Sequence, residues 1–468
     1  MDAREYRRHL SRANELPLLY VVMAFQFACM LLLAFRDGAP DAFSLRMSVF
    51  LPAGTYFGLK LLSRLWPIDR AVYIQVAFLG SLSVILLRAV FRKTDNAADQ
   101  ATYLLVSLAP MLFGVWIVRA LKRHEGFCAA LMPVCLALLV LPFGFTNTAA
   151  RNWVRLGGMQ FQPSELVKPV TVVILASGFS RGNGVRGWWK YALYGALCCG
   201  ILLVEKDLGA MVLYYMLVVA MFYAGTGNRR LTLAGLLITV VAGVLFVKFL
   251  DRIPAFTYVA KRIAIWKNPW NSPDENSRQI MQGLISIASG GIFGAGLGLG
   301  SADRVAVVAS DYIFAAVSEE FGILFALCVL AVYLTLALRG MSIALNARSR
   351  FHALIAFGCA FELTTQMLLI VCGNLHLIPL TGVTLPFISA GGSSMISVWG
   401  LLAFLKASDE RTYAARRAGR HPKGEADEDT ISFTPPRYSP NDPPTPQPRV
   451  NTRAENTAPR SRGAYRVH

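Results

Sequence analysis

Residues 16–35 read LPLLYVVMAFQFACMLLLAF, a stretch without a charged side chain. As an α-helix that rises about 1.5 Å per residue, this stretch would cross the roughly 30 Å hydrocarbon core of a bilayer. Similar apolar runs recur as far as residue 406. One such run could be a buried helix of a soluble protein, but no soluble core has room for a dozen. The pattern therefore predicts an all-α polytopic membrane protein with about twelve transmembrane helices.

The composition agrees with this class. The chain has 468 residues, a mean hydropathy of +0.47, 55% hydrophobic residues and only 16% charged residues. A soluble domain of this length needs more surface charge, and a disordered chain cannot carry so much apolar content. The predicted spans are residues 16–35, 43–62, 72–91, 103–121, 127–146, 169–181, 188–204, 208–225, 230–250, 312–338, 352–373 and 384–406.

Basic residues in the short connections predict the orientation. Cytoplasmic loops carry an excess of Lys and Arg, and every second connection here is basic. Both termini are therefore predicted to be cytoplasmic, and the net charge of +18 does not require a nucleic-acid partner. The basic residues of the inner segments include Arg4, Arg7, Arg64, Arg70, Arg119, Lys122, Arg181, Lys190, Arg229, Arg230, Arg339 and Arg350.

The chain is expected to have three parts. Residues 1–15 form a cytoplasmic N-terminus, and residues 16–406 form the membrane domain. Residues 407–468 are rich in Pro, Arg, Ser, Asn and Thr. Such a segment cannot bury enough apolar surface to fold, so we expect a disordered, basic, Pro-rich cytoplasmic tail.

Polar residues concentrate in three segments of the predicted outer side: residues 147–168, 205–209 and the long extracytoplasmic loop 251–311. In the first segment Glu165 and Lys168 lie three residues apart, so on a helix they share a face and can pair. One interpretation is a capped helix with a surface ion pair. The other is a polar cluster at the mouth of a cavity between helices.

The cavity interpretation is favoured because other charged residues are expected on the same side of the membrane. Arg151 lies in the first segment, and Lys206 and Asp207 form the sharp turn of the second. Charges at a membrane edge are costly unless they are paired or hydrated.

The long outer loop has internal structure in its sequence. A short helix is expected to carry Gln279 and Gln282 on one face, and six glycines follow within residues 290–300. No strand precedes this run, which argues against a nucleotide-binding loop, so close backbone packing or a flexible re-entrant turn is expected instead. Asp311 then lies near the membrane edge, and the adjacent Glu319 and Glu320 lie deeper. A carboxylate pair at that depth implies a hydrated cavity, a basic partner or protonation.

Five sequence blocks carry a resemblance to a known family. In order they are residues 150–153 with 162–168, 206–209, 268–270 through 288–298, 310–316 with 319–320, and 379–394. Together they resemble the SEDS family (shape, elongation, division and sporulation), which comprises FtsW, RodA and SpoVE. Because that family usually has ten spans, the two surplus helices are expected in the N-terminal region.

The resemblance implies a peptidoglycan glycosyltransferase of the bacterial inner membrane that polymerises lipid II for division, elongation or sporulation. It also implies help from a divalent cation, Mg²⁺ or Mn²⁺, and a class B penicillin-binding protein as partner. A carboxylate of the long outer loop would be catalytic. The residues expected to contact substrate are Arg151, Ser164, Glu165, Lys168, Lys206, Asp207, Gln279, Gln282, Asp311, Glu319 and Glu320.

The sequence departs from the family pattern where the catalytic aspartate is expected, because Ser272 occupies that position. A serine without a base cannot replace a carboxylate. Joining two sugars needs a base for the attacking 4-hydroxyl and positive charge near the departing pyrophosphate. Asp274 and Glu275 are the candidates for the catalytic carboxylate, and Asp274 is also the candidate ligand for the divalent cation.

Two other functions remain open at this point. A transporter or flippase for a lipid-linked sugar would also need a hydrated, charged cavity, but no catalytic carboxylate. A non-catalytic family member would act as a scaffold of the division machinery, and Ser272 favours this alternative more than the ordinary family pattern does.

Overall fold

A computed structural model describes residues 15–65, 69–91, 93, 95–120, 124–145, 152–156, 159–180, 187–249, 257–271, 274–347 and 349–409. The chain divides into two units, residues 1–425 and 426–468, and the second lies outside the described residues. The predicted disorder of the tail therefore stays a prediction. Arg151 and Ser272 also lie outside the described residues.

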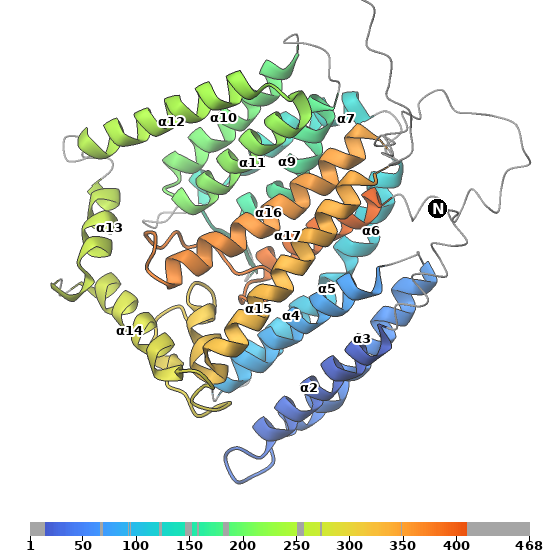
Figure 1. Ribbon diagram of the computed structural model, residues 1–468, viewed down its shortest axis with the longest axis vertical. Coiled ribbons are helices and arrows are strands. Elements are labelled where there is room, and N and C mark those ends of the chain that lie inside the picture. The colour runs from blue at the N-terminus through green and yellow to red at the C-terminus, as the bar shows by residue number, and fades with distance from the viewer. Residues whose placement is uncertain are drawn as a thin grey trace, which may run out of the picture. The chain divides into compact units, whose positions relative to one another are not determined.

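Helices occupy most of the described chain (Figure 1). The first half contains α2 (Leu16–Ala34), α3 (Ala42–Leu65), α4 (Arg70–Val90), α5 (Asp95–Val106), α6 (Leu108–Ala120), α7 (His124–Val140), α8 (Pro142–Phe145), β1 (Val154–Leu156), β2 (Met159–Phe161), α9 (Pro163–Phe179) and α10 (Trp188–Val204). The second half contains α11 (Leu208–Thr226), α12 (Arg229–Phe249), α13 (Thr257–Lys267), η3 (Pro269–Asn271), α14 (Glu275–Gly290), η4 (Ala302–Arg304), α15 (Ile313–Leu345), α16 (Arg350–Asn374) and α17 (Gly392–Ser408).

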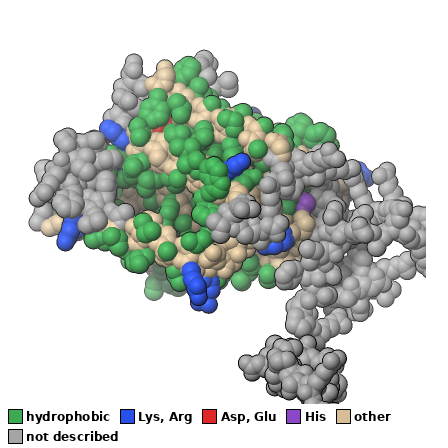
Figure 2. All heavy atoms as spheres, turned by 90° about the horizontal axis from the view of Figure 1, so that it is seen from above, with side chains coloured by type: hydrophobic (Ala, Val, Ile, Leu, Met, Phe, Trp, Pro, Cys, Tyr) green, Lys and Arg blue, Asp and Glu red, His purple; other side chains and the backbone are tan. Residues whose placement is uncertain are grey.

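The prediction of an all-α polytopic membrane protein is confirmed. A helix lies at each predicted span, and Figure 2 shows hydrophobic side chains over much of one face. The number of twelve spans stays a prediction. Seven helical segments of the described chain are long and apolar enough to cross a membrane: Leu16–Ala34, Arg70–Val90, Asp95–Val118, Gly126–Phe145, Leu208–Thr226, Ile313–Leu345 and Arg350–Asn374.

Three helix boundaries differ from the prediction. α9 begins at Pro163, six residues before the predicted membrane span, because proline is favoured in a first turn whose N–H groups have no partner within the helix. The fourth span begins already at Asp95 and is interrupted at Ser107. Pro110 lacks the N–H that would bond back by four residues, which explains the break. α17 starts only at Gly392.

The glycine run between α14 and α15 packs its backbone directly against α15, as predicted. A Cβ at Gly290 would collide with the carbonyl oxygen of Ser318, and one at Gly294 would collide with that of Glu320. Gly322, at φ +83°, interrupts α15 beside this run. Only glycine has the freedom in φ and the absence of Cβ that such contacts require.

The N-terminal helices α2 and α3 form a hairpin that packs on α4 (Figure 1). Gln26 of α2 donates hydrogen bonds to Thr55 of α3 at 2.9 Å and to Ser81 of α4 at 3.0 Å. Phe25 lies against Phe325 of α15, with ring centroids 5.7 Å apart. The hairpin is thus joined to the rest of the membrane domain by buried polar and aromatic contacts.

Helix α9 holds the central position, because it contacts α7, α10, α11, α16 and α17. The short antiparallel hairpin β1–β2 leads directly into it. Side chains on the first turns of α9 are therefore surrounded by several helices, which is where the polar residues meet.

Candidate functional site

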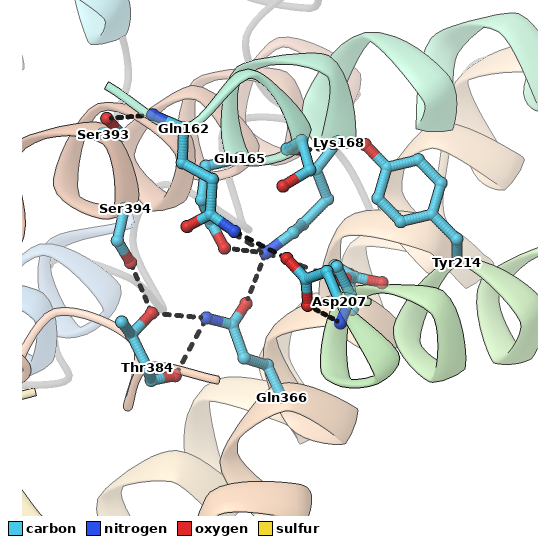
Figure 3. Close-up of polar contacts among 12 residues, drawn as sticks. Gln162, Glu165, Lys168, Asp207, Tyr214, Gln366, Thr384, Ser393 and Ser394 are labelled. Atoms are coloured by element: carbon cyan, nitrogen blue, oxygen red, sulfur yellow. Dashed lines mark hydrogen bonds and ion pairs between the residues drawn. The ribbon is translucent and has the colours of Figure 1, made fainter. Parts of the chain in front are cut away.

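The ammonium group of Lys168 is the centre of a buried polar network in the first turns of α9 (Figure 3). Lys168 Nζ donates to Glu165 Oε1 at 2.9 Å and Oε2 at 3.0 Å. It also donates to Gln366 Oε1 of α16 at 3.1 Å. The predicted pairing of Glu165 with Lys168 is confirmed. Lys168 is only 1% exposed, so the pair is buried and not a surface ion pair.

A second buried carboxyl group faces the same ammonium. Glu362 Oε1 of α16 lies 3.9 Å from Lys168 Nζ, and neither carboxylate oxygen of Glu362 has a hydrogen-bond partner among the described residues. The hydroxyl of Ser164 also lacks one there. Because buried polar groups are nearly always hydrogen-bonded, these atoms identify a place where water or a ligand is expected.

Sequence reasoning did not select Glu362 or Gln366. The available signal was a pair of polar side chains four residues apart, and hence on one helix face, within an apolar span. Such intramembrane polar residues are functional candidates in their own right.

Asp207 brings the turn between α10 and α11 to the start of α9. Its carboxylate accepts hydrogen bonds from Asn152 Nδ2 at 3.0 Å and from Gln162 Nε2 at 2.8 Å. It also caps α11 by accepting from the backbone N–H of Ala210 at 3.0 Å. The expected gathering of the first two polar segments is therefore present, and their contact with substrate stays a prediction.

The two residues before Asp207 are also constrained. Lys206 has a φ of +67°, and its Nζ lies 5.4 Å from the ring centroid of Tyr258 in α13. Burial, assisted by the negative charge of Asp207, raises the pKa of Glu205 to about 8. The turn therefore holds a carboxyl group that stays protonated at neutral pH.

Thr384, which precedes α17, and Ser393 and Ser394, in the first turn of α17, complete the network (Figure 3). Gln366 Nε2 donates to the carbonyl oxygen of Thr384 at 2.9 Å, and the hydroxyls of Thr384 and Ser394 lie 2.6 Å apart. Ser393 accepts from the backbone N–H of Gln162 at 3.1 Å. These residues belong to the last block of the resemblance, but they were not among the predicted site residues.

Helix α13 carries cationic and aromatic side chains toward Asp207 and Asp311. Burial raises the pKa of the Asp311 carboxyl, and the nearby charges of Arg262 and Asp207 lower and raise it respectively. Tyr258, one helical turn before Arg262, also feels the charges of Arg262 and Asp207. These interactions place Asp311 in the same electrostatic neighbourhood as the turn before α11.

Asp274, the predicted catalytic carboxylate, precedes α14 and pairs with α13. Its Oδ2 lies 2.5 Å from Lys261 Nζ, and this hydrogen bond lowers the pKa of Asp274. Lys261 is three residues from Tyr258, so both lie on the same side of the helix. Glu275 is exposed in the first turn of α14. The catalytic assignment to either residue stays a prediction.

The described residues do not form a ready site for a divalent cation. No three His, Cys, Asp or Glu side chains in this part of the chain lie close enough to hold a metal ion. The Asp274 carboxylate is already engaged by Lys261. The predicted cation stays a prediction.

Glu319 and Glu320 bind the glycine run. Glu319 accepts from the backbone N–H of Ser301 at 2.7 Å and from the hydroxyl of Ser286. Glu320 accepts from the backbone N–H of Gly298 at 2.5 Å. Their depth is thus explained by backbone N–H donors, and their predicted contact with substrate stays a prediction.

The two glutamines of α14 have different surroundings. Gln279 Nε2 donates to the carbonyl oxygen of Ala306 at 3.1 Å, which links α14 to the end of the glycine-rich segment. Gln282 is half-buried. Their substrate roles stay predictions.

The fold and the site define a polytopic helical membrane protein with a buried network of charges at the ends of several helices. A family profile described as "Cell cycle protein" (FTSW_RODA_SPOVE) matches residues 67–413. This chain belongs to the FtsW, RodA and SpoVE family of integral inner-membrane proteins. The match begins just before α4, so α2 and α3 lie outside the matched residues, and their assignment as the surplus helices stays a prediction.

Relatives from other bacteria support the assignment. Peptidoglycan glycosyltransferase RodA of Mycobacterium tuberculosis is 32% identical over 331 residues, which cover 66% of this chain and 69% of the relative. Probable peptidoglycan glycosyltransferase FtsW of Geobacter sulfurreducens is 31% identical over 299 residues, which cover 61% and 78%.

Two solved structures share the fold. Rod shape determining protein RodA of Thermus thermophilus aligns with a TM-score of 0.53 at 25% identity over 74% of this chain and 97% of that one. A chain of a peptidoglycan synthase complex that coordinates polymerization and crosslinking aligns with a TM-score of 0.60 at 24% identity over 74% and 98%.

Proposed function

We propose that this chain is a peptidoglycan glycosyltransferase that polymerises lipid II at the predicted outer face of the bacterial inner membrane. Its relatives RodA and FtsW carry that activity in their names. The observation that supports the proposal most directly is the position of α13. This helix brings Lys261 to Asp274 and brings Arg262 into the electrostatic neighbourhood of Asp207 and Asp311.

The reaction needs both signs of charge in one place. The 4-hydroxyl of one sugar attacks the anomeric carbon of another, a glycosidic bond forms, and the bond to the pyrophosphate breaks. Asp274 takes the proton of the attacking hydroxyl, and Lys261 positions this carboxylate through their ion pair. Arg262 and Lys206 stabilise the negative charge of the departing pyrophosphate.

A class B penicillin-binding protein is the proposed partner. The similarity in fold to a chain of a peptidoglycan synthase complex supports this choice. Polymerisation by this chain and crosslinking by the partner would then occur in one assembly.

The test is polymerisation of labelled lipid II by the purified full-length protein, with and without a class B penicillin-binding protein and with Mg²⁺ or Mn²⁺. We expect a glycan ladder on a gel. Asp274→Asn should lower the rate by about 10²- to 10⁴-fold, since this is the usual contribution of a positioned base. Glu275→Gln tests the second candidate carboxylate, and a larger loss there than in Asp274→Asn would assign the base to Glu275.

Two outcomes would contradict this reading at different levels. A ladder that survives Asp274→Asn rejects Asp274 as the base. The absence of a ladder under every condition rejects the enzyme.

A non-catalytic scaffold is the second candidate, because Ser272 stands where the family aspartate is expected and Asp274 is already paired with Lys261. It predicts that the chain still binds the penicillin-binding protein without forming glycan. Lipid II that crosses sealed vesicles without polymerising would instead indicate a transporter.

A further inference from the structure

A cavity lies where the tip of the α2–α3 hairpin meets the glycine run, and none of its lining residues belongs to the Lys168 network. It has a volume of about 530 Å³, within the roughly 300–1,000 Å³ range of small-molecule pockets. We call it the hairpin cavity. It is lined by Arg36, Ala89, Val90, Phe91, Lys93, Asp95, Asn96, Gly298, Gly300, Ser301, Asp303 and Arg304.

Arg36 is the best-defined polar group of the hairpin cavity. Its side chain is only 7% exposed. One terminal nitrogen donates to the carbonyl oxygen of Ala89 at 2.8 Å, and the other lies 3.4 Å from the carboxylate of Asp37. The Nε–H of Arg36 is buried and has no hydrogen-bond partner among the described residues. A buried donor without a partner is costly, so a ligand acceptor there would be stabilising.

The glycine run is shaped to accept this guanidinium. A Cβ at Gly298 would collide with the side chain of Arg36, and the φ of Gly298 is +78°. The backbone N–H of Gly298 is held by Glu320. Any other residue at this position would displace the side chain of Arg36. The absence of a side chain at Gly298 therefore allows the guanidinium to occupy its position.

Two guanidinium groups line the cavity, and a phosphate could bind between them. Arg36 and Arg304 lie there with Lys93, Asp95 and Asp303, and Asp37 also lies 3.4 Å from Arg36, so the anion would be held by directed N–H donors and not by an excess of positive charge. Arg304 is exposed and therefore free to reorient toward a ligand. Guanidinium groups present pairs of N–H donors whose spacing matches phosphate oxygens, so phosphate is the anion that they bind best.

The hairpin cavity depends on helices that the family match does not include. Arg36 follows α2, which lies outside the matched residues 67–413, whereas Gly298 and Arg304 lie inside them. The cavity is thus assembled from an addition to the family core and a segment of that core.

We propose that the hairpin cavity binds a phosphate group on the guanidinium groups of Arg36 and Arg304. The group comes either from the headgroup of an anionic lipid or from a soluble phosphate. This site does not depend on the proposed transferase activity.

The test uses the full-length protein purified in a phosphate-free maltoside detergent. Three probes are added separately: short-chain phosphatidylglycerol, the corresponding diacylglycerol, and inorganic pyrophosphate. Affinity is measured from the rise in the midpoint of thermal unfolding with probe concentration. Phosphatidylglycerol and diacylglycerol differ only in the phosphoglycerol group, so their comparison isolates the phosphate.

Arg36→Gln and Arg304→Gln are each expected to weaken the binding of the phosphate probe about tenfold, the scale of one hydrogen bond to a charged group. Arg46→Gln is the matched control, because Arg46 lies on the same hairpin, is exposed and does not line the cavity. If Arg36→Gln fails to fold, the proposal is tested with Arg304→Gln alone, because Arg304 is exposed and its substitution should not disturb folding.

Binding of phosphatidylglycerol alone supports a lipid headgroup, and binding of pyrophosphate supports a soluble phosphate. The proposal is overturned if diacylglycerol stabilises the protein as much as phosphatidylglycerol does. It is also overturned if neither phosphate probe binds, or if Arg46→Gln weakens binding as much as the two cavity variants do.

Discussion

Two clusters of buried carboxyl groups lie near the ends of membrane helices, and their surroundings differ. Around Glu319 and Glu320, the glycine run turns its backbone N–H groups toward the carboxylates. Around Lys168, two carboxyl groups face one ammonium, and both oxygens of Glu362 lack a partner among the described residues. The first cluster satisfies its charges within the fold, whereas the second retains capacity for a ligand. The burial of a carboxylate therefore says little about its function until its hydrogen-bond donors are known.

The largest expected effect is at the centre of the second cluster. Lys168→Met would leave Glu165 and Glu362 buried without their cation, and breaking a buried ion pair costs about 3–5 kcal/mol. We expect a strongly lowered midpoint of thermal unfolding and loss of glycan synthesis. Lys190→Met is the matched control, since Lys190 is exposed and lies over the ring of Trp189.

Glu362→Gln tests whether both carboxyl groups around Lys168 are needed for stability. It leaves one carboxyl group facing the ammonium and should preserve the unfolding midpoint far better than Lys168→Met does. Equal losses in the two variants would mean that Glu362 is required as a second counter-charge, and that its oxygens are not spare capacity for a ligand.

A smaller effect is expected where the glycine run crosses α15. Gly322→Ala would place a Cβ against the carbonyl oxygen of Ile292 at a φ of +83°, and strain of this kind costs about 1–3 kcal/mol. The unfolding midpoint should fall, while the activity per folded molecule should be largely kept. Gly126→Ala is the control, because nothing lies within 4 Å of the added Cβ. Lost lipid II binding by well-folded Gly322→Ala protein would contradict a purely structural role for this cluster.

A pH-dependent effect is expected at the turn before α11. Because the pKa of Glu205 is raised from 4.5 to about 8, the folded state holds a proton that the unfolded state releases. The contribution to stability is present below about pH 4.5 and is lost as the pH rises toward 8. Glu205→Gln should remove this part of the pH dependence, which is measured by thermal unfolding between pH 5 and 9. An unchanged pH profile in the variant would rule out Glu205 as its source.

The Glu165–Lys168 pair illustrates what local spacing can predict. Two side chains three positions apart on one helix share a face, so the pairing could be predicted without any tertiary information. The burial of this pair could not be predicted, because it depends on Gln366 and Glu362 of α16, which lie almost two hundred residues later in the chain. The same limit applies to Asp274, because its partner Lys261 lies on a different helix, α13. Helix periodicity therefore does not predict that the two side chains meet.

The sequence by itself determined the class of protein, the approximate positions of its helices, the family and most of the charged segments, because hydrophobic length and short motifs are local properties. Only the tertiary structure decided which of those charges meet. It separated Glu319 and Glu320, which bind the glycine backbone, from Lys168, which gathers carboxyl groups of two helices. It also joined the N-terminal hairpin to the glycine run at Arg36. Partners far apart in the chain are set by helix packing, which no local pattern encodes.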